Sequence, residues 1–318
     1  MSRPIPLRVA LCVLIGFSLW FSDQAYSEEV LRRSNVEIEL GAKTWISQGR
    51  TKWSHNASSL DPSLGNPTSE LNYKDISSNV VELHGQVSLR NGLFFRGQFG
   101  YGGIDDGKLI DDDFLTGQNL ISRTQSDIDG SHLWYLNADV GLKVLSFSGG
   151  RGSLKAFAGY QYWQETYEAK GIIQLVPPVG TVPTGGRTVI TNEVEWNSIR
   201  LGLEGGYQIT RRFSINGSAA FIPYTSLKNE DIHHFRPDLR QDPSISMRGS
   251  GIGANFDLTA SYMIVKQLFL DLGYRYWWVQ VTDEDLQFRF SNGITSTVNL
   301  NEFQTIRHGV TLGLTYKF

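Results

Sequence analysis

The chain contains almost no cysteine and, beyond its first residues, no long apolar run. Cys12 is the single cysteine among 318 residues, and it lies within the apolar stretch at residues 9–21. If that stretch is removed from the mature protein, no disulfide can form, and stability must come from hydrogen bonding and packing. No later segment approaches the roughly 20 apolar residues of a transmembrane helix, which excludes a helical membrane protein.

The first 27 residues have the features of a secretory signal peptide. Two arginines precede the apolar stretch, and small residues at positions 25–27 offer a cleavage site. We therefore expect a signal peptide at residues 1–27 and one mature domain at residues 28–318. The net charge is −3 for the whole chain and becomes about −4 after cleavage, because two arginines and one aspartate leave. Such an acidic balance argues against nucleic acid as a partner.

Residues 304–318 alternate without a break between two kinds of side chain. One set is Ile306, His308, Val310, Leu312, Leu314, Tyr316 and Phe318, and the other is Thr305, Arg307, Gly309, Thr311, Gly313, Thr315 and Lys317. A period of two places each set on one face of a strand. An apolar face ending in aromatic residues, opposite a small and polar face, is typical of a barrel strand with lipid outside and water inside.

About ten segments of this kind run along the chain. Short turns follow the second, fourth, sixth and eighth segments, and long loops follow the others, which is the rhythm of barrels that keep short turns in the periplasm. The 33 glycines, 13 tyrosines, 17 phenylalanines and 8 tryptophans fit a polar lumen and aromatic belts, despite a mean hydropathy of −0.23. We predict an all-β fold, a transmembrane antiparallel up-and-down β-barrel of about ten strands in the bacterial outer membrane.

A secreted β-sandwich is the alternative fold. It would need an apolar buried face on every strand and loops of similar length at both ends. Glycine and charged residues on the inward faces of the segments at residues 133–146, 268–278 and 304–318 argue against it.

Two of the long loops carry residues suited to acid–base chemistry. The second contains Asp111, Asp112 and Asp113, and the fourth contains Asp231 and His233. In a ten-stranded barrel these loops rise from nearly opposite walls, so their side chains can face each other across the extracellular mouth. A histidine near an aspartate can act as a general base, because the carboxylate orients the ring and stabilises the imidazolium. A second carboxylate pair can hold a water and share its proton.

Three other interpretations of these loops stay open. They could be solvated acidic loops, as most charge runs are. Asp111, Asp112, Asp113 and His233 could bind a metal ion through oxygen and imidazole, although no H-E-x-x-H or calcium-loop spacing is present. His234 could replace His233, since neighbouring residues of a strand point in opposite directions.

The order of the strands, the rhythm of the loops and the two acidic motifs resemble the omptin family of outer-membrane proteases. The sharpest matches are Asp111-Asp112-Asp113-Phe114, similar to a D-x-D motif followed by an aromatic residue, and Asp231-Ile232-His233, similar to a D-x-H motif. Gly159-Tyr160-Gln161, Ser126 and the C-terminal aromatic ending are lesser matches. The resemblance covers nearly the whole mature chain.

The resemblance implies an aspartyl-type endopeptidase that works without a cofactor or a metal. Asp111 and Asp113 would form a carboxylate couple, and Asp231 with His233 a dyad. Water held between them would attack the scissile carbonyl of an extracellular polypeptide, which in this family is commonly cut between basic residues. We expect a monomer whose partners are a polypeptide substrate and the lipid of the outer membrane, with lipopolysaccharide as one candidate.

Two departures limit what the resemblance implies. The acidic pocket for a basic side chain maps near Trp53 and Asn229, neither of which is acidic, so a dibasic preference is not carried over. Basic residues that would hold lipopolysaccharide are not evident at residues 162–165, so dependence on that lipid is not carried over either. The alternative function is that of a non-catalytic outer-membrane barrel, as an adhesin, a porin-like channel or a structural protein.

Overall fold

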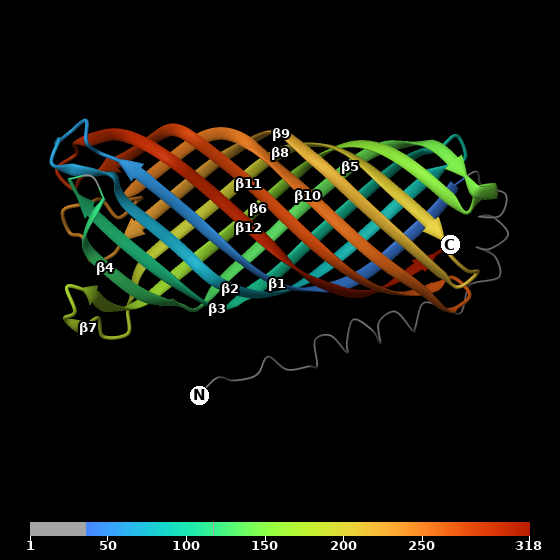
Figure 1. Ribbon diagram of the computed structural model, residues 1–318. Helices are drawn as coiled ribbons and strands as arrows, with labels where there is room; N and C mark the ends of the chain where they lie inside the picture. The colour runs from blue at the N-terminus through green and yellow to red at the C-terminus, as the bar shows by residue number, and fades with distance from the viewer. Residues whose placement is uncertain (1–35, 117) are drawn as a thin grey trace.

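The computed structural model describes residues 36–116 and 118–318, and nearly all of them are in β-strands (Figure 1). The wall of a single barrel consists of the long strands β1 (Val36–Asn56), β2 (Leu64–Leu89), β3 (Leu93–Leu115), β5 (Ser131–Phe147), β6 (Gly152–Val176), β8 (Thr188–Gln208), β9 (Phe213–His233), β10 (Ile245–Val265), β11 (Leu268–Arg289) and β12 (Thr295–Lys317). Two shorter strands, β4 (Asn119–Ile128) and β7 (Gly180–Val182), lie at one end of the barrel, and a 3₁₀ turn, η2 (Ser148–Gly150), lies between β5 and β6. No helix long and apolar enough to cross a membrane occurs in this described part of the chain. The expected signal peptide, residues 1–27, lies outside the described residues.

The ten long strands close into a ring. Each pairs antiparallel with the next long strand along the chain, and β12 pairs with β1. In the register of β1, Trp45 faces Thr311 on one side and Val80 on the other. A closed ring has no free strand edge, so the wall itself supplies partners for its backbone groups. The prediction of an antiparallel up-and-down barrel of about ten strands is confirmed.

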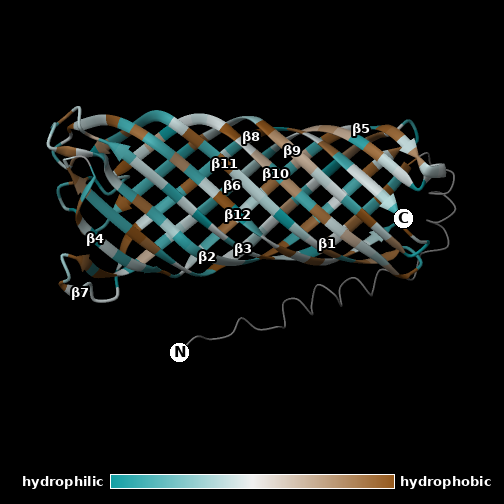
Figure 2. Cartoon of the chain, in the orientation of Figure 1, coloured by the Kyte–Doolittle hydropathy of each residue, from teal (hydrophilic) through white to brown (hydrophobic). Residues whose placement is uncertain are grey.

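The outward face of the barrel changes character along its axis, over strands whose alternating apolar and polar residues are visible in Figure 2. Toward the short turns the outward side chains are apolar, as for Val81 and Leu83, which are 63% and 55% exposed. Farther along they are charged, and Lys52 Nζ lies 3.1 Å from Glu70 and 3.0 Å from Glu302. A strand crosses the hydrocarbon core in about 9–11 residues, whereas the long strands have 17 to 26. The wall therefore projects well beyond the membrane.

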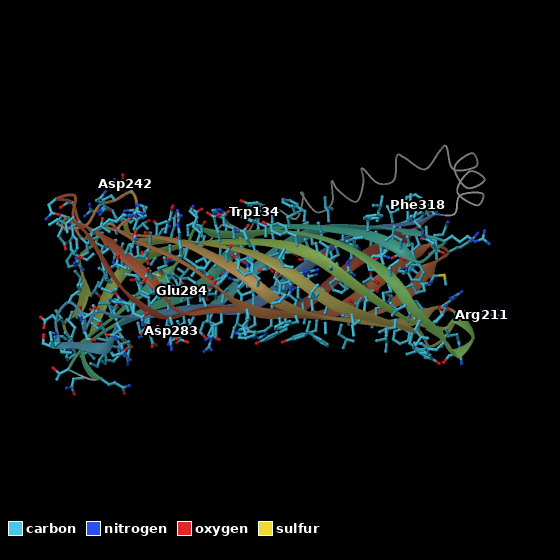
Figure 3. The ribbon with its side chains drawn as sticks, turned by 90° about the horizontal axis from the view of Figure 1, so that it is seen from above. Trp134, Arg211, Asp242, Asp283, Glu284 and Phe318 are labelled. Carbon is cyan, nitrogen blue, oxygen red and sulfur yellow. The ribbon has the colours of Figure 1, made fainter. Side chains whose placement is uncertain are left out.

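Short turns and long connections lie at opposite ends of the barrel. The turn that carries Arg211 lies at the same end as Phe318, and Asp242, in the long connection between β9 and β10, lies toward the other end (Figure 3). Because outer-membrane barrels keep their short turns in the periplasm, the projecting half with charged outward side chains is extracellular.

Apolar side chains fill the lumen of the projecting half. Trp277 lies at the centre of an aromatic layer, with its ring centroid 5.0 Å from Trp45, 4.8 Å from Tyr135 and 5.5 Å from Trp163. All four side chains are 1% exposed or less. Tilted and edge-to-face contacts of this kind are favourable beyond the burial of area alone, so the layer is a rigid closure below the mouth.

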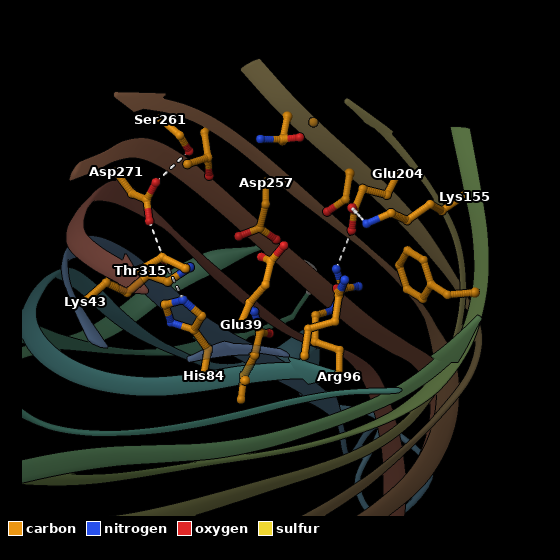
Figure 4. A pocket seen from close by; sticks show the side chains of 18 of the residues that line it. Glu39, Lys43, His84, Arg96, Lys155, Glu204, Asp257, Ser261, Asp271 and Thr315 are labelled. Carbon is orange, nitrogen blue, oxygen red and sulfur yellow. Dashed lines mark hydrogen bonds and ion pairs between the residues drawn. The ribbon is translucent and has the colours of Figure 1, made fainter. Parts of the chain in front are cut away.

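Buried ion pairs follow the aromatic layer toward the periplasmic end. Arg275 donates to Glu82 and to Asp257, each at 2.6 Å, and its guanidinium lies 5.0 Å from the Trp277 ring centroid. The cation therefore joins the ionic layer to the aromatic one. Beyond the ion pairs is a cavity of about 190 Å³ lined by charged and polar side chains (Figure 4).

The strands are longer than the sequence pattern predicts, and this places the candidate site residues on strand ends rather than in loops. The prediction that Asp111, Asp113, Asp231 and His233 lie in long loops is wrong, because β3 continues to Leu115 and β9 to His233. Outside the membrane the sense of the alternation inverts: Leu109 is 1% exposed and lies in the lumen, whereas Lys108 is exposed. An outward apolar face, the sign of a membrane strand, disappears where the wall leaves the lipid.

Candidate active site

Asp111 and Asp113 point into the mouth of the barrel from β3. Their cross-strand partners on β2 are Leu71 and Ser69, and Leu71, 2% exposed, belongs to the lumen core. Because cross-strand partners share a face, both carboxylates face inward. Ser69 Oγ donates to Asp111 Oδ1 at 3.4 Å.

Asp112, which lies between them, points to the outside of the barrel. Its carboxylate accepts hydrogen bonds of 2.6 and 2.7 Å from the guanidinium of Arg123 on β4. The three consecutive aspartates therefore cannot ligate one metal ion. No group of three histidine, cysteine, aspartate or glutamate side chains suited to a metal occurs within residues 36–116 and 118–318.

Asp231 and His233 enter the mouth from the end of β9, four places from β3 in the ring of ten long strands. Asp231 is 0% exposed, and its Oδ2 accepts a hydrogen bond from Asn192 Nδ2 on β8 at 3.1 Å. Its Oδ1 lies 3.4 Å from His233 Nε2, which leaves Nδ1 as the ring nitrogen available to a water. The His233 backbone N–H donates to Ser244 Oγ at 3.0 Å and fixes the strand end.

His234 lies outside this arrangement. Its side chain is exposed, and its Nε2 is 2.9 Å from Thr191 Oγ1. The alternation of the strand turns it away from the mouth, so His233 is the histidine that the structure brings to Asp231.

The carboxylates of the two walls interact electrostatically. Burial raises the pKa of Asp111 well above its usual range, and the charges of Asp113 and Asp231 raise it further. Burial also raises the pKa of Asp113, although a hydrogen bond from Ser69 opposes the rise. Neighbouring carboxylates do not ionise together readily, so the couple of Asp111 and Asp113 retains a proton at neutral pH.

Burial also decides the charges of the dyad. It raises the pKa of Asp231 to about 7. It lowers the pKa of His233 to about 4, with the charge of Arg236 adding to the effect. His233 is therefore a neutral imidazole at neutral pH and can accept a proton, and the adjacent carboxylate can stabilise the resulting imidazolium.

Sequence reasoning missed three side chains of this site. His55 on β1 is the cross-strand partner of Ser69, is 5% exposed and interacts electrostatically with the dyad histidine. Asn192 holds the dyad carboxylate, and Tyr73 lies two residues from Leu71 on the inward face of β2. No short motif marks these residues. The feature of the sequence that could have indicated them is the reversed alternation of β1 and β2, in which apolar side chains face inward near the extracellular ends of the strands.

The positions singled out by the resemblance also face inward. Trp53 and Asn229 are 1% and 0% exposed, and the Asn229 amide donates to Asn192 Oδ1 at 3.1 Å and to the Glu193 backbone carbonyl at 2.9 Å. Ser126 on β4 is 5% exposed. The wall next to Asp231 is therefore lined by the amides of Asn192 and Asn229, whereas the Trp53 indole lies on β1 beside Leu71.

Comparison with solved structures identifies the architecture. The outer membrane protease OmpT from Escherichia coli is similar, with a TM-score of 0.73 and 14% identity over 89% of this chain and 97% of that chain. Two other barrels match only at low TM-scores. One is the translocator domain of the autotransporter NalP from Neisseria meningitidis, with a TM-score of 0.40 and 12% identity over 98% of this chain and 97% of that chain. The other is the toluene transporter TbuX from Ralstonia pickettii, with a TM-score of 0.31 and 8% identity over 91% of this chain and 90% of that chain. At these identities the likeness establishes the fold alone.

No curated protein matches the sequence. A family described as Pom, Protochlamydia outer membrane protein, matches residues 46–318, which include every candidate site residue. The apolar outward belt, the closed ring and the family match agree on location in the bacterial outer membrane. The chain is an outer-membrane β-barrel and belongs to the Protochlamydia outer membrane protein family.

Proposed function

We propose that the protein is an omptin-like endopeptidase that hydrolyses extracellular polypeptides with an activated water. The observation that carries the proposal is the meeting of two acid–base pairs at one extracellular mouth. Asp111 and Asp113 come from one wall, and Asp231 and His233 from the other. The likeness of the fold to that of an outer membrane protease supports the same conclusion.

The charge states of the site suit general base catalysis. In the proposed reaction the water oxygen bonds to the scissile carbonyl carbon while His233 Nδ1 accepts a water proton, and Asp231 stabilises the imidazolium. The proton held by Asp111 and Asp113 goes to the carbonyl oxygen as charge develops there. The C–N bond then breaks, the amine leaves with the proton from His233, and a hydroxyl proton returns to the carboxylate couple.

The filled lumen weighs against the channel alternative. The aromatic layer around Trp277 and the pair of Arg275 with Glu82 lie across the path between the mouth and the periplasm. An adhesin or a structural barrel, in turn, has no need of titratable pairs that face inward. A binding surface for a partner would be expected on the outward or upper side chains instead.

Peptide cleavage by the refolded protein tests the proposal. Wild-type protein in lipid bilayers, with and without lipopolysaccharide, should cleave members of a mixed peptide library at neutral pH. Asp111→Asn and His233→Ala should each reduce kcat/KM by about 100-fold or more. The neighbouring variants Asp112→Asn and His234→Ala, whose side chains point away from the mouth, should remain close to wild type.

Two results would contradict the proposal. The first is the absence of cleavage by the wild type in both lipid conditions. The second is wild-type activity in either Asp111→Asn or His233→Ala. Because both acid–base pairs belong to one chain, we also propose that the monomer is active, which dilution of the protein in the same assay would check.

A further inference from the structure

Tyr73 forms part of the floor below the two acid–base pairs. On β2 its cross-strand partners are Thr51 and Leu109, and it lies two residues from Leu71, the partner of Asp111. Alternate residues of a strand share a face, so the ring of Tyr73 enters the lumen one step below Asp111. Its side chain is 0% exposed.

A second tyrosine holds this ring in place. Tyr73 stacks on Tyr167 of β6, with ring centroids 4.8 Å apart and an interplanar angle of 25°. The hydroxyl of Tyr167 donates to Glu165 and lies 3.0 Å from Thr51 Oγ1. Arg307 donates to Glu165 at 2.5 Å. Because Tyr167 is fixed from several sides, the stacked ring of Tyr73 has little freedom to turn away.

The hydroxyl of Tyr73 is a buried donor below the carboxylates of the mouth. It has no hydrogen-bond partner among the described residues, and neither has Asp231 Oδ1, which lies 3.4 Å from His233 Nε2. Tyr73 interacts electrostatically with Asp231 and Asp111. Buried polar groups are hydrogen-bonded in about 90% of cases or more, and polar groups that face each other beyond direct reach are commonly bridged by a water.

We propose that Tyr73 is a positioning residue of the protease site, whose hydroxyl donates a hydrogen bond to a buried water that bridges it to Asp231 Oδ1. A donor in this place favours the ionised carboxylate. It thereby preserves the charge that stabilises the imidazolium of His233 during proton transfer. The positioning role rests on the proposed function, whereas the link between Tyr73 and Asp231 does not require catalysis.

Several other titratable or charged groups lie around the dyad or around the stacked rings of Tyr73 and Tyr167, and the test has to separate them from the hydroxyl. They are His55 on β1, Asp111 and Asp113 on β3, Glu165 and Tyr167 on β6, His233 on β9, Arg236 after β9 and Arg307 on β12. Tyr73→Phe keeps all of them and keeps the stacked ring. A change in pH dependence in this variant therefore reports the loss of one hydroxyl.

Stability across pH tests the link directly. The full chain, refolded in lipid bilayers, is unfolded with urea at pH 5 and pH 9. Tyr73→Phe should lower the urea midpoint at pH 9 and leave it unchanged at pH 5, because the bridged donor matters to the ionised carboxylate. In an Asp231→Asn background the same substitution should have equal effects at both pH values.

The pH profile of peptide cleavage tests the positioning role. Tyr73→Phe should move the acid limb of kcat/KM upward by about one pH unit, since Asp231 would ionise less readily. Tyr135→Phe is the matched control. Its hydroxyl donates to Glu82, below the aromatic layer, so this substitution should leave the acid limb in place.

The outcomes separate the two proposals. If Tyr73 carries only an unsatisfied hydroxyl, its removal should leave the urea midpoint unchanged or raise it at every pH, and that result overturns the inference even if peptides are cleaved. An unmoved acid limb overturns the positioning role. Loss of stability at pH 9 without any cleavage retains the link but refutes the protease function, and with it the positioning role.

Discussion

Replacing Asp231 with asparagine should make the stability of the barrel less dependent on pH. Asp231 is 0% exposed, and burial raises its pKa from 3.8 to about 7. A carboxyl group whose pKa is raised by folding stabilises the folded state below its unfolded pKa, and this contribution is lost as pH rises through the folded pKa. The wild type should therefore lose stability as the pH rises from 3.8 to about 7. The variant, which is uncharged at residue 231 at every pH, should not show this loss.

The size of the effect follows from the two pKa values. They differ by about three units, and one unit corresponds to about 1.4 kcal/mol, so the loss due to Asp231 approaches about 4 kcal/mol at pH 8 and above. The charge of Asp231 also raises the pKa of Asp111. Removing Asp231 eases ionisation of Asp111 and adds to the difference between the wild type and the variant.

Urea unfolding at a series of pH values from 4 to 9 measures the effect, with the fluorescence of the 8 tryptophans as the signal. Asp283→Asn is the control for loss of a carboxylate at an exposed position of β11, where the φ of 56° is one that asparagine accepts. Parallel curves for the wild type and Asp231→Asn would show that Asp231 ionises without cost in the folded barrel. The raised pKa of Asp231 in the folded barrel would then be refuted.

Three further predictions concern specificity, stability and the lumen. Because Trp53 and Asn229 offer no negative charge, fluorogenic peptides with a neutral residue before the scissile bond should be cleaved at least as fast as dibasic ones, and a clear dibasic preference would contradict this. Arg307→Met should cost about 3–5 kcal/mol in urea unfolding because Glu165 loses a buried partner at 2.5 Å. Adding Glu165→Gln should recover most of that loss, and a lack of recovery would argue against an uncompensated charge as its cause. Planar bilayers should show no conductance for the wild type, and large open steps would mean that the layer around Trp277 does not close the lumen.

The architecture could be predicted from local patterns. The apolar face of residues 304–318 and the spacing of the turns depend on single strands and hairpins, and the period of two is a property of each strand by itself. The same property places Asp111 and Asp113 on one face, and Asp231 and His233 on another. The location in the outer membrane follows from the outward apolar belt, since each membrane strand shows it separately.

The site depended on relations between strands that no local pattern contains. The alternation of apolar and polar residues reverses beyond the lipid, so the sequence pattern did not show where β3 and β9 end. The outward direction of Asp112 and His234 could therefore not be predicted. Asn192 contacts Asp231 through the register of β8 with β9, and ring closure brings Tyr73 of β2 into the same lumen. The sequence by itself determined which neighbouring side chains of a strand share a face. The tertiary structure decided which faces meet, because contacts across a closed barrel depend on the pairing of all its strands at once.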